Sequence, residues 1–494
     1  MTGVQQDTPR GRMTGAWIAA IGAIVALAVG LRLAQLSIFD ISHSDELMQY
    51  LEQANRIATG HGIVPWEWRF GLRNALVPQM LSVPLVIGHA LAPGTLPGVW
   101  AARLLFATLT LLALPAAWRL GALTGRVHAL LALFVVGVWW ESVLYSDLLL
   151  SESLGAALML MGGALLLDAR TRTRGLALAG LLVGLAVLVR LQYGVFGVVL
   201  TCGALRLNMA RWRPFLAGAL AAGGIGALSD LAAGLTPFSW IWVNLQMNIG
   251  EGRAGRFGTA GPLAYLAMLR DHLWPFMPLV LIGAVAAGTR YRPLLYAALV
   301  NVAVHSLIAH KEYRFIWIST LTFLLLAGIG SAHLAQRLAR GRGAGAGIVA
   351  AIAMMLAWAG MSAWSAQLTG GASAYRGGSA VPRLANRAAA DPKVCAIAVD
   401  YEYKGHIVPT LLARPLPLLL IPRAISRESA PMPPALAASV NALVLQRLPA
   451  GAQGYRQVAC GTLGDERPCL FVRAGICRPD AQWGYQQQLE ANEL

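Results

Sequence analysis

Long apolar segments separated by short polar ones occupy the chain from Trp17 to about Trp364. Many of these segments have the roughly 17–25 residues that a helix needs to cross a bilayer. From about residue 367 onward the apolar runs become short. The pattern therefore predicts an all-α polytopic membrane domain over residues 1–366, followed by a smaller domain of different character over residues 367–494.

Composition and charge fit this division. Hydrophobic residues make up 57% of the chain, charged residues only 13%, and the mean hydropathy of +0.58 exceeds that of soluble proteins. A net charge of +16 would suggest nucleic acid as the partner of a soluble protein. Here the arginines gather in short loops, as in cytoplasmic loops under the positive-inside rule, so the charge indicates topology and not a nucleic-acid partner. The clusters are Arg10/Arg12, Arg119/Arg126, Arg170/Arg172/Arg174, Arg206/Arg211/Arg213, Arg290/Arg292 and Arg337/Arg340/Arg342.

These clusters predict about eleven spans, with the N-terminus inside and residues 367–494 outside. Residues 39–97 form the first exterior loop and residues 235–262 a large later one. The apolar segment 75–92, which contains two prolines, would invert every later arginine cluster if it crossed, so we expect a helix at the outer interface. The N-terminal apolar run is too long for a cleavable signal. The expected spans are 17–39, 98–118, 128–147, 150–168, 175–190, 191–206, 214–234, 263–288, 293–309, 315–335 and 346–366.

The sequence of residues 367–494 predicts a small exterior α/β domain. Two glycine pairs, Gly370-Gly371 and Gly377-Gly378, form a linker, and residues 394–399 predict a buried strand that ends at Asp400. Four of the five cysteines, Cys395, Cys460, Cys469 and Cys477, lie in this domain. Their spacing matches no zinc signature, and an exterior location favours disulfides, whose connectivity the sequence leaves open.

The first candidate for chemistry is the segment His43-Ser44-Asp45-Glu46, just past the first apolar run. Ionisable groups at this depth are costly unless they pair or face water. Apolar residues from Leu47 onward follow helical spacing as far as Gly60. Two interpretations stay open: Ser42-x-x-Asp45 is a capping box that begins this helix, or Asp45 is a general base whose pKa partial burial raises.

A second polar cluster, residues 310–315, reads His-Lys-Glu-Tyr-Arg-Phe between two apolar stretches. Lys311 and Arg314 are three residues apart, so on one helical face they could hold a phosphate. The alternative is a set of interfacial anchors at helix ends. Weaker candidates are Glu141, Asp147 and Glu152 around one exterior turn, and Arg190 with Gln192 at another.

Both clusters resemble motifs of glycosyltransferase family 22, which contains the dolichol-phosphate-mannose-dependent mannosyltransferases of GPI-anchor and N-glycan assembly. His43-Ser44-Asp45-Glu46, Trp66-Glu67-Trp68 and Leu72-Arg73 resemble the family's His-Pro-Asp-Glu, Trp-Glu-Trp and Leu-Arg-Ser segments, and residues 310–315 resemble its His-Lys-Glu-x-Arg-Phe motif. Arg190 matches the arginine of an Arg-Pro-Thr motif whose other two residues differ here. The resemblance covers roughly residues 15–340.

The resemblance implies a GT-C fold and an inverting transfer, with neither metal nor cofactor, from a polyprenyl-phosphate sugar to a hydroxyl of a glycan or glycolipid acceptor on the exterior face. It implies that Asp45 is the base and that Glu46 orients the acceptor or shares its proton. The donor phosphate and lipid are expected at His310, Lys311, Arg314 and Arg190. Substrate contacts are expected at His43, Trp66, Glu67, Arg73, Asn244, Asn248 and Glu312.

Two departures from the family leave alternatives open. Ser44 replaces the family's proline, and the cysteine-bearing C-terminal domain is not implied by the resemblance. A related transferase using an arabinofuranose or aminoarabinose donor is one alternative, and a polyprenyl-lipid transporter is another. No internal repeat supports transport. Scarce lysine with abundant arginine, alanine and glycine points to a bacterium with a GC-rich genome, and hence to its inner membrane.

Overall fold

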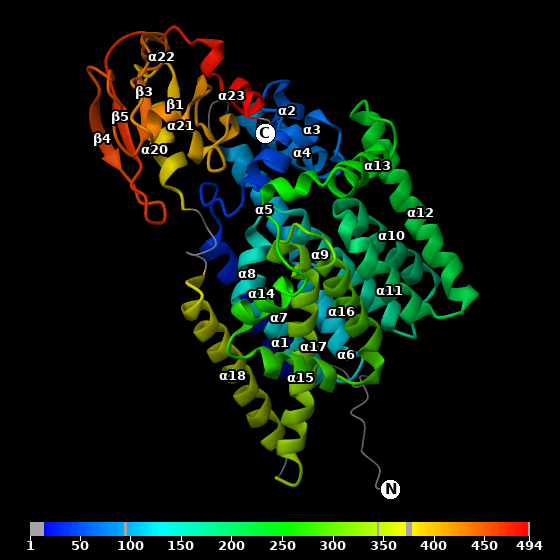
Figure 1. Ribbon diagram of the computed structural model, residues 1–494. Coiled ribbons are helices and arrows are strands. Elements are labelled where there is room, and N and C mark those ends of the chain that lie inside the picture. Colours follow the sequence, from blue (N-terminus) through cyan, green and yellow to red (C-terminus); the bar gives the residue numbers. More distant parts are fainter. Residues whose placement is uncertain (1–13, 93–95, 343–344, 372–377, 493–494) are drawn as a thin grey trace. The chain divides into compact units, whose positions relative to one another are not determined.

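A computed structural model describes residues 14–92, 96–342, 345–371 and 378–492 (Figure 1). Its contacts divide the described chain into two compact units. The helical unit takes its residues from 1–35, 107–147 and 151–372, and the mixed unit from 36–106, 148–150 and 373–494. The first exterior loop thus groups with the C-terminal region. The predicted arginine pair Arg10/Arg12 and linker residue Gly377 lie outside the described residues.

The helical unit is built from apolar helices joined by short turns. Its α-helices are α1 (Gly15–Gln35), α6 (Ala113–Ala122), α7 (Arg126–Val138), α8 (Trp140–Asp147), α9 (Ser151–Leu167), α10 (Thr173–Val189), α11 (Gly194–Leu205), α12 (Met209–Ala232), α13 (Ser239–Leu245), α14 (Ala264–Leu273), α15 (Met277–Ala286), α16 (Arg292–Ser306), α17 (Trp317–Ala339) and α18 (Ala346–Leu368). Short turns η2 (Leu191–Tyr193), η3 (Gln246–Gly250), η4 (Arg253–Phe257), η5 (Thr289–Tyr291) and η6 (Tyr313–Ile316) connect them. Helix α5 (Pro97–Thr110) contributes to both units.

Length and hydropathy identify the strongest membrane spans. In the described residues five helical stretches can cross a bilayer, and α7 with α8 makes a sixth if the bent pair is one span. Shorter apolar helices follow most of the other predicted spans, so the count of eleven stays a prediction. Two of the expected spans are not single straight helices. Residues 128–147 form the bent pair α7 and α8. Residues 263–288 form α14 and α15, because the chain breaks at the Trp274-Pro275 bond and a proline cannot continue a helix.

Helix α17 lies at the centre of the helical unit and packs against α7, α15, α16 and α18. Close packing elsewhere depends on glycine. Helices α10 and α12 lie side by side, and a Cβ at Gly180 would come within 1.9 Å of the Phe215 carbonyl oxygen (Figure 1). Gly218 meets the Ala177 carbonyl oxygen in the same way, at 1.8 Å. Small residues here let the two backbones touch, as is common between membrane helices.

The bend between α7 and α8 depends on a buried arginine. The two helices meet at 60° around Trp139. A break in a membrane helix leaves carbonyl groups without donors, which must be satisfied inside the protein. The guanidinium of Arg32 on α1 donates to the carbonyl oxygens of Gly137 at 2.8 Å and of Val136 and Ser142 at 3.3 Å. Arg32 is therefore a structural residue that holds the bend.

In the mixed unit, the first exterior loop folds as the π-helix η1 (Glu46–Leu51), α2 (Glu52–Thr59), α3 (Trp66–Arg69) and α4 (Leu76–Leu91). The predicted end at Gly60 is confirmed: its left-handed φ of 76° closes α2. Helix α4 packs against α2 and η1. The loop is joined to the C-terminal region by the buried carboxylate of Glu52, which accepts hydrogen bonds from Ile63 and Thr410.

The C-terminal region contains the predicted strand and a five-stranded sheet in the order β2-β1-β3-β5-β4. The strands are β1 (Ile397–Asp400), β2 (Leu418–Ile421), β3 (Ala442–Leu445), β4 (Arg456–Cys460) and β5 (Cys469–Val472), with β1 parallel to β2 and β3, and β5 antiparallel to β3 and β4. Helices α20 (Ala380–Ala389), α21 (Arg423–Ser426), α22 (Pro434–Ser439) and α23 (Tyr485–Ala491) accompany it, with the short turns η7 (Tyr401–Tyr403), η8 (Pro409–Leu411) and η9 (Ala481–Trp483) (Figure 1).

The expectation of disulfides in this domain is confirmed. Cys395 bonds to Cys477, across a sequence separation of 82 residues, and Cys460 bonds to Cys469 between paired strands. Cys202 is exposed and not bonded. Because cross-links limit the conformations of the unfolded chain, the first pairing, which closes the longer loop, contributes more to stability in the chain-entropy account.

Candidate functional site

Two groups of polar side chains, one in each unit, contain the residues that the sequence singled out. In the mixed unit, Glu46 begins η1 and is completely buried, with a side-chain exposure of 0%. One of its oxygens accepts the backbone N–H groups of Ser42 at 2.8 Å and His43 at 3.2 Å. The other accepts the N–H of Leu149 at 3.1 Å and pairs with the Arg103 guanidinium at 3.0 Å. Every direction around this carboxylate is thus occupied by a donor.

Glu46 supplies a capping carboxylate at this helix start, because it reaches back to the N–H groups of Ser42 and His43. Asp45 directly precedes η1, and its side chain does not cap that π-helix. The capping box Ser42-x-x-Asp45 stays a prediction. The Asp45 carboxylate is partly exposed, at 18%, and lies 3.6 Å from His43 Nδ1. The two neighbouring acids therefore have different surroundings, since Glu46 is buried among donors and Asp45 is partly exposed.

Arg73 and Glu67 belong to the same group. The Arg73 guanidinium meets both oxygens of Glu67, at 2.8 and 3.2 Å, in a bidentate pair that fixes the orientation of both side chains. Burial works against the charge of Arg73, yet the carboxylates of Glu67 and Asp45 and the Tyr50 hydroxyl outweigh it and raise its pKa. Trp66 precedes Glu67 on α3 and is half-buried. The loop thus brings His43, Asp45 and Glu67 together near the fixed positive charge of Arg73.

In the helical unit, the predicted helical face for Lys311 and Arg314 is wrong. Lys311 lies in an irregular segment, Glu312 is extended, and only Tyr313–Ile316 form a short turn before α17. The Glu312 carboxylate folds onto Arg314 at 2.6 Å and onto His310 at 3.0 Å, which holds the segment out of a helix. The two cations are presented by an irregular segment.

Three cations and two carboxylates meet around this segment. Arg190 lies 3.1 Å and Arg314 3.6 Å from the same oxygen of Glu152, which is completely buried. Both guanidinium groups also lie over the ring of Phe315, at 4.9 and 5.2 Å from its centroid. With Lys311 and Glu312 included, the formal balance is three positive against two negative charges. A buried group with excess positive charge and several N–H donors suits an oxyanion.

The large exterior loop is tied to this cluster by its backbone. Lys311 donates to the carbonyl oxygens of Ala260, at 3.0 Å, and Ile308. His310 Nδ1 lies 2.8 Å from the Gly258 carbonyl oxygen. Asn244 and Asn248, from the same loop, are half-buried on α13 and η3, and within the described chain neither hydrogen-bonds to the cluster.

Sequence reasoning missed the residues that support the two groups. His272 on α14 stacks on Tyr313, with ring centroids 3.4 Å apart, and its Nδ1 lies 2.7 Å from the Glu141 carboxylate. Tyr145, re-aimed by the bend before α8, stacks on Trp317 at 4.1 Å. Arg103 holds Glu46. The sequence feature that could have identified such residues is an arginine or glutamate inside an apolar segment, because a charged residue there needs a partner.

The comparison with protein families decides the classification. The sequence model of the Alg9-like mannosyltransferase family matches residues 23–375, which include both polar groups. The chain belongs to the Alg9-like mannosyltransferase family. Two sequences of GPI mannosyltransferase 3 from Trypanosoma brucei brucei are similar over short stretches, at 39% identity over 56 residues and 37% over 79 residues. These stretches cover 11% and 16% of this chain, and only 10% and 14% of the two relatives.

Solved structures show how this family member folds. ArnT from Cupriavidus metallidurans, determined with undecaprenyl phosphate, superposes with a TM-score of 0.54 at 14% identity, over 95% of this chain and all of that one. The apo oligosaccharyltransferase of Archaeoglobus fulgidus gives a TM-score of 0.50 at 12% identity, over 94% of this chain and 75% of that one. The similarity, together with the apolar helices, establishes a GT-C-like fold in an integral membrane protein.

Proposed function

We propose that the protein is a membrane glycosyltransferase that transfers a mannose-type sugar from a polyprenyl-phosphate donor to a hydroxyl group of a glycan or glycolipid. The observation that carries this proposal is the family match, which spans both the 43–46 and the 310–315 segments. In the reaction, the acceptor oxygen forms a bond to the anomeric carbon while the bond to the donor phosphate oxygen breaks. Attack from the face opposite the leaving group inverts the configuration.

Asp45 takes the acceptor proton in this proposal. A base must present a carboxylate with room for a hydroxyl group, and the partial exposure of Asp45 meets that need. Glu46, saturated by Arg103 and backbone donors, orients the loop that carries Asp45. Arg73, His43, Trp66 and Glu67 contribute substrate contacts from the same loop.

Arg190, Lys311 and Arg314 stabilise the leaving polyprenyl phosphate, with His310 and Glu312 fixing their positions. A phosphate leaving group carries its own negative charge and needs no proton, so preorganised cations suffice for its departure. The reaction thus requires neither a metal ion nor a cofactor. The undecaprenyl phosphate in the ArnT structure, which shares the fold, supports a polyprenyl-phosphate carrier.

We further propose a bacterial inner-membrane location, eleven spans and a reaction on the exterior face. The predicted spans all contain helical segments of the structure, and two disulfides in the C-terminal region suit an oxidising compartment. A transferase for aminoarabinose or arabinofuranose remains the second candidate, since the shared GT-C-like fold is common to enzymes with different sugars.

The decisive test is donor consumption by purified protein across radiolabelled polyprenyl-phosphate mannose, arabinofuranose and aminoarabinose. Consumption of the mannose donor alone supports the proposal, and consumption of a pentose donor alone replaces it with the second candidate. Movement of labelled lipid across vesicles without consumption would identify a transporter.

Donor affinity tests the phosphate cluster separately. Arg314→Ala and Lys311→Ala should each weaken donor binding by about 1.5–3 kcal/mol, the scale of hydrogen bonds to charged groups. Arg253→Ala, which removes a partly exposed arginine paired with Glu251, is the control and should bind as the wild type does. Unchanged donor affinity in both cluster variants would exclude this role.

A further inference from the structure

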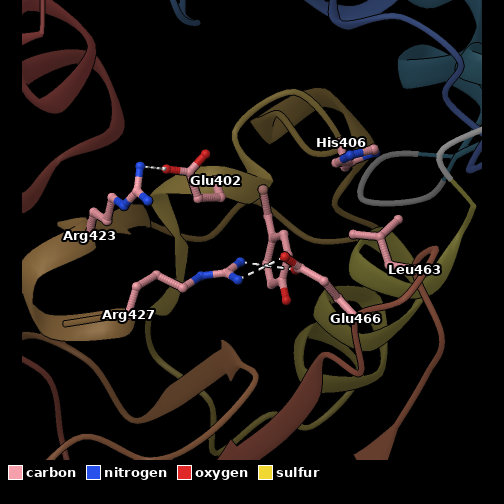
Figure 2. A pocket seen from close by; sticks show the side chains of 7 residues that line it. Glu402, His406, Arg423, Arg427, Leu463 and Glu466 are labelled. Atoms are coloured by element: carbon pink, nitrogen blue, oxygen red, sulfur yellow. Dashed lines mark hydrogen bonds and ion pairs between the residues drawn. The ribbon is translucent and has the colours of Figure 1, made fainter. Parts of the chain in front are cut away.

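The C-terminal region contains a polar pocket that is lined by none of the residues assigned to the transfer step. Its volume is about 500 Å³, within the roughly 300–1,000 Å³ of small-molecule sites. Three loops line it: the segment after β1, the segment after β2 and the turn between β4 and β5 (Figure 2). The residues are Glu402, Tyr403, His406, Arg423, Arg427, Leu463 and Glu466.

The position of the pocket in the sheet points to a ligand. Strands β2, β1 and β3 are parallel, and the pocket residues follow the carboxyl ends of β1 and β2. The chain leaves β1 for β2 on one side and then crosses to β3 on the other, which places a topological switch point at β1. In open α/β sheets, ligands bind outside the carboxyl ends of the strands at such a point.

The pocket walls are held in place by Asp400, the last residue of β1. Its completely buried carboxylate accepts the N–H of Glu402 at 3.0 Å, the hydroxyl of Ser426 at 3.0 Å and the guanidinium of Arg427 at 2.5 Å. Arg427 also pairs with both oxygens of Glu466, at 2.7 and 2.9 Å (Figure 2). One carboxylate therefore fixes two of the three loops, and Arg427 connects them to the third.

The charges of the pocket argue against an anion. Among the lining residues, Arg423 and Arg427 are offset by Glu402 and Glu466, so the walls carry no formal net charge. Behind the walls, Asp400 pairs with Arg427 and interacts with Lys404. Burial lowers the pKa of His406, which keeps it neutral at neutral pH. A phosphate group would find Arg427 already engaged by two carboxylates.

We propose that this pocket binds an uncharged saccharide. Fixed carboxylates accept hydrogen bonds from pairs of hydroxyl groups, and guanidinium groups donate to them, so charge-balanced walls suit a ligand made of hydroxyls. The same groups offer little to an apolar ligand, because Leu463 and Tyr403 are the only largely apolar side chains among those lining residues. We assign the saccharide to the glycan part of the acceptor, an assignment that rests on the proposed function.

The test measures binding of neutral disaccharides to the purified full chain by saturation-transfer NMR. The probes are α-linked mannobioses and maltose, with inorganic phosphate and ethanolamine as charged comparisons. Binding of a neutral disaccharide should weaken at least tenfold in Glu402→Gln. Folding should be unaffected, because the Glu402 side chain is 41% exposed and its contact with Arg423 is long, at 3.9 Å. Glu466→Gln should have the same effect. Glu428→Gln is the control, because this glutamate, 63% exposed, pairs with Arg423 without lining the pocket.

Absence of saccharide binding by the wild type, equal binding by Glu402→Gln and the wild type, or preference for phosphate or ethanolamine would overturn the proposal. A parallel donor-consumption assay on the wild type separates it from the proposed function. Donor consumption without saccharide binding refutes the pocket alone. Saccharide binding without consumption of any polyprenyl-phosphate sugar refutes the assignment to an acceptor.

Discussion

Asp45 and Glu46 show how strongly the surroundings of a residue decide what it can do. Both are acids at the start of one helix, and adjacent residues on a helix point about 100° apart. Glu46 faces Arg103 and three backbone N–H groups inside the protein, while Asp45 keeps 18% of its side chain exposed. The oxygens of Glu46 are occupied by these donors and leave no room for an acceptor hydroxyl, so Asp45 is the better placed base.

Asp45→Asn should lower turnover by at least about a hundredfold, the usual scale of lost general-base catalysis. The substitution keeps the size and polarity of the side chain, so the melting temperature and donor affinity should stay close to those of the wild type. Initial rates of donor consumption, with donor affinity measured in parallel, check this. Glu46→Gln should instead destabilise the fold by about 3–5 kcal/mol, because it removes the carboxylate charge that faces the buried Arg103 guanidinium. Near-normal turnover in Asp45→Asn would show that this loop does not supply the base.

Glu466 gives the C-terminal region a defined response to acid. The hydrogen bonds from Arg427 lower the pKa of this carboxyl from 4.5 to about 2. The ionised Glu466 carboxylate therefore contributes its full share to the free energy of unfolding above pH 4.5. This contribution is lost as the pH falls toward 2, because the unfolded chain binds a proton at this carboxyl at a higher pH than the folded chain does. The protection factors of peptides from residues 395–472, taken relative to the intrinsic exchange rate at each pH, should fall between pH 4.5 and 2. In Glu466→Gln this part of the fall should be missing, and an identical pH profile of protection in both proteins would contradict the pairing.

Among the secondary-structure elements, the bent pair α7 and α8 is the one that brings side chains to the phosphate cluster. The bend lets Glu141 reach His272, and Tyr145 reach Trp317, next to the 310–315 segment. The bend persists because Arg32 supplies donors to the carbonyl groups at the break. A residue on the first helix thus supports a site on distant parts of the chain.

Arg32→Leu should lower the melting temperature of the detergent-solubilised protein, because the buried Gly137 carbonyl loses its side-chain donor, at a cost of about 1–3 kcal/mol. Arg32→Lys should fall between this variant and the wild type, since an ammonium group can donate to some of the same oxygens. Thermal unfolding followed by circular dichroism compares the three proteins. Equal melting temperatures for the leucine variant and the wild type would show that the bend does not depend on Arg32.

The sequence was sufficient for features set by local composition and insufficient for those set by distant partners. The long apolar helices α1, α12, α17 and α18, the α2 end at Gly60 and the disulfides were predicted, because length, glycine and cysteine content act locally. The prediction that Lys311 and Arg314 share a helical face is wrong, because Glu312 pairs with Arg314 and this segment does not form a helix. The Glu46–Arg103 pair and the pocket beyond the carboxyl ends of β1 and β2 each bring together residues that are far apart in sequence. The periodicity of apolar residues therefore could not predict either of them.

At the scale of the whole molecule, the side of the membrane on which each later loop lies depends on whether helix α4 crosses the bilayer. Most of its 16 residues are apolar, and it packs against α2 and η1 of the first exterior loop. If it crossed the bilayer, every arginine cluster after it would change sides. The positive-inside rule favours the arrangement in which it does not cross.

Labelling of single cysteines distinguishes the two arrangements. Cys202→Ala removes the one cysteine that the two disulfides leave unpaired, and the exposed positions Arg172, Glu251 and Gln453 then each receive a cysteine. On intact cells a membrane-impermeant maleimide should label Glu251→Cys and Gln453→Cys, and should label Arg172→Cys only after lysis. The pattern follows because Arg172 belongs to a basic loop, while Glu251 lies in the large exterior loop and Gln453 in the disulfide-bonded region. Labelling of Arg172→Cys on intact cells, with the other two protected, would mean that α4 crosses the membrane and would place the phosphate cluster on the cytoplasmic side.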